Sequence, residues 1–283
     1  MNRDVSSSTC CPESTQKQIE HIIQGHARYQ AFFFGPFRIT RAGQPLGESG
    51  WRRNKAKALL KWFLLNPGDL FAAEQLSKLF WPECSTKVAT NNLHVTLHYL
   101  RRVLEPELAP GQPSSFVRRN RHNYYWFDHK DSWWSDVDEV HRLSACMKEA
   151  ERTGDHVQTL RYAQALLNYY RLGFLPEDIY EDIFAPYRRQ HEYASIQLLT
   201  NLLSLYTQFT QLDEAFSCAL QLLSLDPYNE NALKTMVHIY VYQGNIAGAL
   251  RQLDDFQRSL KDDLGIEPEE ELLALRDTIL GVR

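Results

Sequence analysis

The secondary-structure pattern of the chain changes once, near residue 130, and this change constrains the fold more than any other feature. Before it, short aromatic and β-branched runs alternate with short amphipathic stretches. From Asp136 onward the chain carries only amphipathic helical stretches, separated by Gly, Asn or Asp-Pro. We therefore expect two domains, at 30–130 and 136–283, preceded by a polar, disordered tail at 1–29.

The first domain has the element order of a winged helix-turn-helix. The run AFFFGPFRIT, followed by Ala42-Gly43 as a turn and Gln44-Pro45-Leu46 as the returning strand, predicts a short edge hairpin. Three helices are then predicted over 51–65, 73–80 and 85–104, and each is followed by a proline that ends it. The run SFVRRNRHNYYWF predicts a second β-hairpin with a basic tip, which would be the wing.

The second domain is predicted to be a tetratricopeptide-like helical bundle. The stretch QLDEAFSCALQLLSLDP resembles GNIAGALRQLDDFQ, with Ala215 matching Ala249 at a spacing of 34 residues. Small residues at fixed places let paired helices approach closely, so each pair can bury its apolar face against the next. The expected fold is therefore mainly α: a winged helix-turn-helix (α+β) followed by an all-α bundle.

The net charge of −4 conceals a strong partition between these domains. Residues 30–127 hold 14 Lys and Arg against 6 Asp and Glu, a net charge of +8, whereas residues 128–283 hold 14 against 26, a net charge of −12. A basic half joined to an acidic half indicates that one domain meets a polyanion and the other does not. Double-stranded DNA is the polyanion that a winged helix-turn-helix would bind.

The third predicted helix carries two stripes at helical spacing. One is apolar and is expected to be buried: Ala89, Leu93, Leu97, Leu100 and Leu104. The other is polar, with flanking members: Lys87, Asn91, His94, His98 and Arg101, flanked by Thr90, Tyr99 and Arg102. Residues 86–104 contain no Asp or Glu, and the polar side chains can all hydrogen-bond to a base edge or a phosphate. The sequence therefore predicts that this helix reads DNA.

Two further basic groups are expected to hold the DNA backbone. Arg118, Arg119 and Arg121 lie at the tip of the second hairpin, where a wing would place them on phosphates or in the minor groove. Arg53 and Lys55 open the first helix. Contacts of this kind add affinity and salt dependence without reading bases.

Motifs throughout residues 30–283 resemble one bacterial family. Those of the first domain are FGPFRITRAGQPL, WRRNKAKALLKWFLLNPG, LSKLFWPE and NNLHVTLHYLRRVLEP. Those of the second are GFLPEDIYEDIFAPYRRQ, LDPYNENAL and GALRQLDDFQRSLKDDLGIEPEEEL. Together they resemble the antibiotic-pathway regulatory proteins (SARP-type), which are activators with an OmpR-type winged helix followed by a bacterial transcriptional activation domain.

The resemblance implies a promoter-bound activator. Its partners would be double-stranded promoter DNA, bound at direct repeats by side-by-side protomers or a homodimer, and RNA polymerase. It also implies that Asn91, His94, His98, Tyr99 and Arg101 contact DNA. Several of these positions are Arg in response-regulator relatives, so the target sequence stays open.

Other function classes find little support in the sequence. It has no G-x-S-x-G, H-E-x-x-H or phosphate-loop motif, so we expect no enzyme, no catalytic residue and no cofactor. The five cysteines are scattered, without a C-x-x-C pair, so neither a metal site nor a disulfide framework is expected.

No apolar run of about twenty residues and no secretory signal occurs, so we expect no membrane contact. The expected location is the bacterial cytoplasm, at the nucleoid when the protein is bound to DNA. One alternative remains open: a helical-repeat interaction scaffold whose winged helix binds protein rather than DNA.

Overall fold

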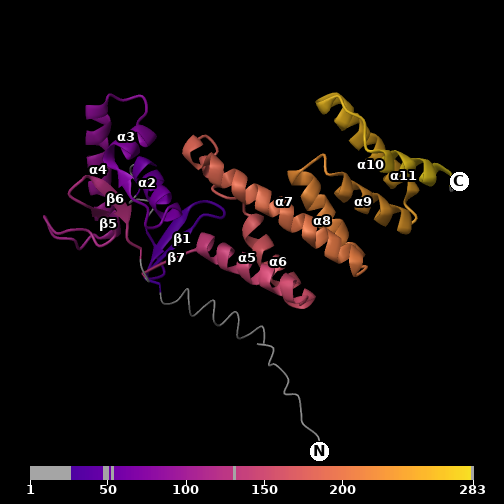
Figure 1. The fold of residues 1–283 in the computed structure, drawn as a ribbon, viewed down its shortest axis with the longest axis horizontal. Helices are drawn as coiled ribbons and strands as arrows, with labels where there is room; N and C mark the ends of the chain where they lie inside the picture. Colours follow the sequence, from indigo (N-terminus) through magenta and orange to yellow (C-terminus); the bar gives the residue numbers. More distant parts are fainter. Residues whose placement is uncertain (1–26, 47–50, 52–53, 130–131, 282–283) are drawn as a thin grey trace, which may run out of the picture. The chain divides into compact units, whose positions relative to one another are not determined.

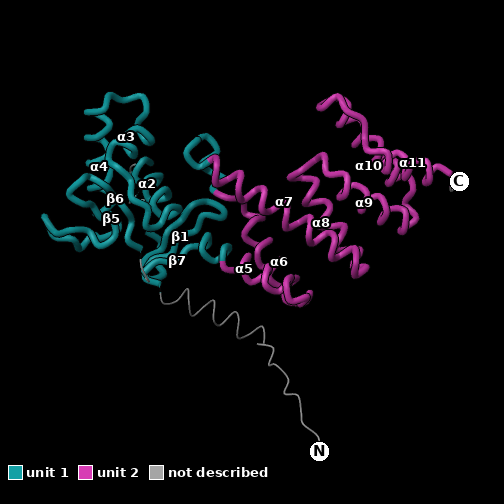
Figure 2. The backbone as a smooth tube through the Cα atoms, in the orientation of Figure 1, with its two compact units in different colours: residues 1–141, 175–184 teal, residues 142–174, 185–283 magenta. Residues whose placement is uncertain are grey.

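The computed structural model describes residues 27–46, 51, 54–129 and 132–281, and the chain divides into two compact units (Figure 2). Unit 1 comprises the residues up to His141 together with Leu175–Phe184, and unit 2 comprises Arg142–Phe174 and the residues from Ala185 onward. Residues 175–184 thus fold with the N-terminal unit, although the sequence pattern groups them with the helical half.

Unit 1 contains a four-stranded sheet with the strand order β3-β2-β1-β7. Its strands are β1 (Tyr29–Phe32), β2 (Arg38–Arg41), β3 (Gln44–Pro45) and β7 (Trp133–Ser135). Figure 1 labels β1 and β7 of this sheet. β1 pairs antiparallel with β2 and parallel with β7. β2 pairs antiparallel with β3 across Ala42 and Gly43, which confirms the predicted edge hairpin. β7 was not predicted, because its three residues lie between the two expected domains.

The second sheet of unit 1 has the order β4-β6-β5 and lies beside three helices (Figure 1). The strands are β4 (Phe71–Ala72), β5 (Val117–Arg119) and β6 (Tyr124–Phe127), and the helices are α2 (Asn54–Leu65), α3 (Ala73–Phe80) and α4 (Thr86–Leu104). β5 and β6 pair antiparallel as the predicted wing, with Arg118 opposite Trp126. The three helices agree with the predicted ranges to within a few residues at the described positions.

Aromatic side chains join the first sheet to the end of α4. The hydroxyl of Tyr29 donates to the backbone carbonyl of Leu104 at 2.6 Å, and its ring stacks on Trp133 with centroids 4.6 Å apart. Phe116 and Phe127 pack edge-to-face on the same indole. Because a buried hydroxyl needs a partner, this bond fixes the C-terminal end of α4 on the sheet.

A buried carboxylate joins the first helix of the C-terminal half to unit 1. Asp136, which is 1% exposed, begins α5 (Asp136–Thr153) and accepts the backbone N–H groups of Phe33 and Phe34 at 2.8–3.0 Å. Burial raises the pKa of this carboxyl to about 7, although the two N–H groups and the charge of Arg38 act in the opposite direction. The first turn of α5 is therefore part of unit 1, and the helix continues into unit 2.

Unit 2 contains the rest of α5 and a series of further helices, and from α6 onward neighbouring helices pack on one another. They are α6 (His156–Tyr170), α7 (Ala185–Gln208), α8 (Leu212–Leu225), α9 (Glu230–Tyr242), α10 (Ile246–Ser259), the π-helical turn η5 (Leu260–Leu264) and α11 (Glu270–Gly281). Ala215 and Ala249 are both fully buried, as expected for the small residues of a helical repeat. None of the helices in the described residues is long and apolar enough to cross a membrane.

Candidate nucleic-acid interface

The N-terminal two-thirds of α4 presents a polar face to solvent. Lys87, Asn91, His94 and His98 are exposed, while all five members of the predicted apolar stripe are buried, together with Thr96. The helix begins after Ser85 and contains no carboxylate in any of its 19 residues, all of which are described. An acid-free exposed face of this kind can approach a polyanion without repulsion.

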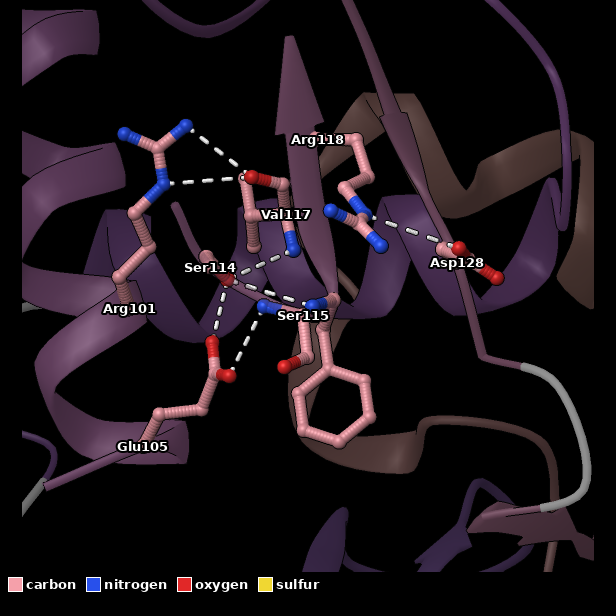
Figure 3. A network of polar contacts seen from close by, with 8 residues as sticks. Arg101, Glu105, Ser114, Ser115, Val117, Arg118 and Asp128 are labelled. Carbon is pink, nitrogen blue, oxygen red and sulfur yellow. Dashed lines mark hydrogen bonds and ion pairs between the residues drawn. The ribbon is translucent and has the colours of Figure 1, made fainter. Parts of the chain in front are cut away.

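Arg101 lies at the edge of this face, and its side chain makes hydrogen bonds within unit 1. Its guanidinium is half-buried and donates from Nε and Nη2 to the backbone carbonyl of Val117 in β5, at 3.3 and 3.1 Å (Figure 3). The pKa of this guanidinium is lowered, mainly because the group is partly buried. The bonds hold the first strand of the wing against α4, so the geometry gives Arg101 a positioning role in addition to any contact with DNA.

A second set of bonds secures the start of the wing to the end of α4 (Figure 3). Glu105 is buried and accepts the hydroxyl of Ser114 and, at 2.9 Å, the backbone N–H of Ser115. The Ser114 oxygen in turn accepts the N–H of Val117 at 3.0 Å. Since Glu105, Ser114 and Val117 are buried, these bonds fix the direction in which the wing leaves α4.

The wing carries the three predicted arginines in different settings, with Arg118 and Arg119 on β5 and only Arg121 at the tip, because the strand extends further than the sequence pattern indicates. Arg118 is half-buried and lies 3.7 Å from a carboxylate oxygen of Asp128 (Figure 3). Arg119 is exposed, donates from Nε to the side chain of Asn123 at 3.1 Å and lies over the ring of Tyr125. Arg121 is exposed at the turn. Arg119 and Arg121 are therefore the arginines most accessible to a phosphate.

The lysines of α2 are matched by acidic residues from Leu175–Phe184, here called the acidic segment. Its two ends, Leu175 and Phe184, are fully buried, and the N–H of Leu175 donates to the carbonyl of Phe33 at 2.9 Å. Between them, Glu181 lies 3.5 Å from the ammonium of Lys55 and Glu177 lies 2.7 Å from that of Lys57. The segment thus places carboxylates along the basic side of α2.

Lys61, one turn further along α2, is the most buried of these lysines. It is 2% exposed, bonds to Glu177 at 3.1 Å and to Asp178, and its ammonium lies 4.7 Å from the centre of the Phe37 ring. Burial acts to raise the pKa of Glu177, but the bonds from Lys57 and Lys61 outweigh it and lower that pKa. Lys61 is accordingly a structural charge that depends on its carboxylates.

The remaining predicted residues occupy the flanks or lie outside the described residues. Thr90 and Tyr99 are half-buried on α4, and Arg102 is exposed and donates to the carbonyl of Leu108 at 2.7 Å. Arg53 lies outside the described residues. Lys55 is described but half-buried beside Glu181, so a phosphate would have to compete with this carboxylate.

Three residues of this region were not singled out by the sequence patterns. Lys61 was missed because its partners lie more than 110 positions away, although a lysine inside the apolar run ALLKWFLL is an unusual feature. Val88 and Val95 do not belong to the polar pattern that defines the second stripe. Both valines are exposed on α4.

The three helices, the small sheets and the basic hairpin secured to α4 define unit 1 as a winged helix-turn-helix. Unit 2 adds a helical domain, so the predicted fold class is confirmed. A model of the family described as "Bacterial transcriptional activator domain" matches residues 135–280. Because this match covers just over half of the chain, the chain belongs to that family of bacterial transcriptional regulators, and the resemblance found in the sequence is confirmed.

Two curated relatives and one solved structure extend this finding. The chain is 26% identical over 251 residues to the regulatory protein AfsR of Streptomyces griseus, a match that covers 87% of this chain and 24% of AfsR. It is 23% identical over 251 residues to the transcriptional regulatory protein MoaR1 of Mycobacterium tuberculosis, covering 87% of this chain and 77% of MoaR1. The chain thus spans about a quarter of the length of AfsR.

The structural relative is Mycobacterium tuberculosis EmbR, solved in complex with a low-affinity phosphopeptide. The two folds are similar with a TM-score of 0.69 at 20% sequence identity, over 90% of this chain and 66% of the EmbR chain. At this identity the likeness concerns the fold, and it extends through both units.

Proposed function

We propose that this protein is a sequence-specific DNA-binding activator of transcription in the bacterial cytoplasm. The observation that carries the proposal is the exposed face of α4, on which Lys87, Asn91, His94 and His98 point outward from a helix without a carboxylate. In this proposal the winged helix of 30–130 binds promoter DNA and the domain of 136–283 contacts RNA polymerase. No catalytic step or cofactor is part of it.

The DNA contacts fall into two groups. Asn and His on α4 meet base edges in the major groove, because their side chains can donate to and accept from specific bases. The basic residues of the wing and the helix ends meet phosphates and set the register. The proposed contacts are Lys87, Thr90, Asn91, His94, His98, Tyr99, Arg101, Arg102, Arg118, Arg119, Arg121 and Arg53. Lys55, the remaining residue predicted from the sequence, lies beside Glu181 and is proposed to contribute little.

The negative charge of the C-terminal half supports the proposal that unit 2 binds another protein and not DNA. A region of net charge −12 is repelled by phosphates, and stacked helical units commonly present surfaces to other proteins. The names of AfsR and MoaR1 describe regulatory proteins, which agrees with this assignment. We propose that the partners of unit 2 are RNA polymerase and a second protomer bound to an adjacent direct repeat.

The first test is selection of a binding site with the full chain. A random duplex library should yield an enriched sequence, and binding to that duplex should weaken steeply with salt, with a log–log slope of about −0.9 for each phosphate neutralised. Arg152→Ala serves as a control, because Arg152 is an exposed arginine of unit 2 paired with Glu149. Enrichment of no sequence, or binding that is insensitive to salt, would favour the protein-binding scaffold instead.

The second test concerns activation. With purified bacterial RNA polymerase and a promoter that carries the selected site, the full chain should increase the yield of run-off transcript. A template in which only that site is scrambled should show no increase. If the protein bound the site tightly but did not stimulate the polymerase, the proposed DNA binding would stand and the proposed activation would be wrong.

A further inference from the structure

Two large hydrophobic residues are exposed on α4, and they lie on one line along the helix. Val88 is 49% exposed and Val95 is 42% exposed. Their spacing of seven residues is two helical turns, or about 10.5 Å along the axis. Asn91 is also exposed and lies about one turn from each of them. The valines therefore belong to the same acid-free face that is proposed to enter the DNA.

Neither valine contributes to the core of unit 1. The buried stripe of α4 is complete without them, and it lies on the opposite side of the helix. A β-branched residue is also a poor choice for a solvent-exposed helix position, where Ala, Lys or Glu would favour the helix more. A single exposed valine is unremarkable, but two in one line on a polar face indicate a ligand with apolar groups at matching places.

The major groove offers one apolar group at its base edges, the C5-methyl of thymine. We propose that Val88 and Val95 read thymine methyl groups in the binding site, a specificity that rests on the proposed DNA-binding function of α4. The distance of about 10.5 Å between the two valines along the helix axis corresponds to about three base-pair steps of 3.4 Å each. The site should therefore contain two thymines within about three base pairs of each other, close to an adenine that Asn91 can read.

Deoxyuridine provides a direct test, because it pairs like thymine and lacks only the C5-methyl. In the site selected by the full chain, each thymine is replaced singly by deoxyuridine and the Kd is measured by fluorescence anisotropy. At two positions we expect the wild-type protein to bind about fourfold more weakly, the effect of losing one buried methyl group. Val95→Ala should lose this sensitivity at one of these positions, and Val88→Ala at the other.

Three controls separate methyl recognition from a change in folding. Val95→Ile keeps the branched apolar side chain and should retain the sensitivity to deoxyuridine. Val157→Ala removes a valine that is 64% exposed on α6 and should change neither Kd nor the deoxyuridine profile. Alanine is the better helix former, so the melting temperatures of Val88→Ala and Val95→Ala should not fall.

The possible results distinguish this inference from the function on which it rests. If the protein binds its site and Asn91→Ala weakens that binding, but no deoxyuridine position matters, thymine reading is wrong and the DNA-binding function stands. Equal losses on thymine and deoxyuridine sites for both valine variants would also overturn it. If no DNA site can be selected, both the function and the inference fail.

Discussion

Unit 1 has two basic surfaces, on α2 and on α4, and they differ in what lies beside them. Lys55, Lys57 and Lys61 of α2 each have a carboxylate of the acidic segment within 3.5 Å. On α4, Lys87 and its polar neighbours share a helix that has no carboxylate at all. Both surfaces count equally in the net charge of +8, yet only the second is available to an external anion. Local pairing, more than net charge, therefore distinguishes the surface proposed to bind DNA from the other basic surface.

The largest effect is expected where a charge of α2 is buried. Replacing Glu177 by Gln and Asp178 by Asn together leaves Lys61 buried without an anionic partner, which should lower the free energy of unfolding by about 3–5 kcal/mol. Urea denaturation of the full chain measures this change. Glu74→Gln is the control, because Glu74 pairs with the exposed Lys78 and should cost less than about 0.5 kcal/mol.

Repeating the two substitutions in a Lys61→Met variant shows whether the loss of stability arises from Lys61. In Lys61→Met the buried side chain is apolar and of similar length, so the same two substitutions should cost far less than in the wild-type protein. An equal loss in both backgrounds would mean that Glu177 and Asp178 stabilise unit 1 by some route other than this lysine.

Asp136 offers the contrasting case of a buried carboxyl held by backbone N–H groups. Its pKa is raised from 3.8 to about 7 by burial, so the unfolded chain releases this proton more readily than the folded protein. The contribution of this group to stability is therefore fully present below about pH 4 and is lost as the pH rises toward 7. The integrated change is up to about 4 kcal/mol.

Unfolding of Asp136→Asn, measured at intervals between pH 4 and pH 7, checks this expectation. The amide keeps the size of the side chain and cannot ionise, so its stability should decline less over this range than that of the wild-type protein. Glu177 should behave in the opposite sense, because its lowered pKa gives stability that is lost as the pH falls. Parallel profiles for Asp136→Asn and wild type would refute the assignment to Asp136.

On α4 a smaller, sequence-dependent effect is expected. Asn91→Ala should weaken binding to the selected DNA site by about 1–3 kcal/mol and relax the preference at one base pair. Arg119→Ala at the wing should weaken binding to specific and random duplexes by similar amounts, because a phosphate contact carries no sequence information. If Asn91→Ala also reduced both equally, α4 would hold DNA without reading it.

The smallest effect contrasts the two basic surfaces directly. Lys87→Ala should reduce the magnitude of the log–log salt slope by about 0.9, the value for one phosphate contact. Lys55→Ala should leave the slope nearly unchanged, because its charge is already matched by Glu181. A full-sized reduction for Lys55→Ala would show that DNA displaces the acidic segment from this lysine.

The sequence predicted α4 well because helix periodicity is a local property. The buried stripe from Ala89 to Leu104 follows from the spacing of apolar residues alone, and the polar face follows from it. The same periodicity places Arg101 on the polar face beside His94 and His98. Periodicity could not indicate the bonds from Arg101 to Val117, since these depend on where the wing lies after folding.

The non-local features could not be derived in this way. β7 is three residues long, and its pairing with β1 spans about a hundred residues. The acidic segment has no periodicity and appears in the sequence as a loop between helices. Its contacts with Phe33 and Lys61 are set by tertiary packing, which neither propensity nor charge counts encode.

The acidic segment also affects the order in which the protein can fold during synthesis. The ribosome completes the wing at Phe127 but must add another 57 residues, including α6, before Phe184 exists. At about 5–20 residues per second this takes roughly 3–11 s. During that interval Lys61 has no carboxylate partner and the buried site of Leu175 is vacant. We expect the nascent N-terminal unit to remain incompletely folded for these seconds, so chains that end early would be substrates for chaperones or proteases before they could occupy DNA.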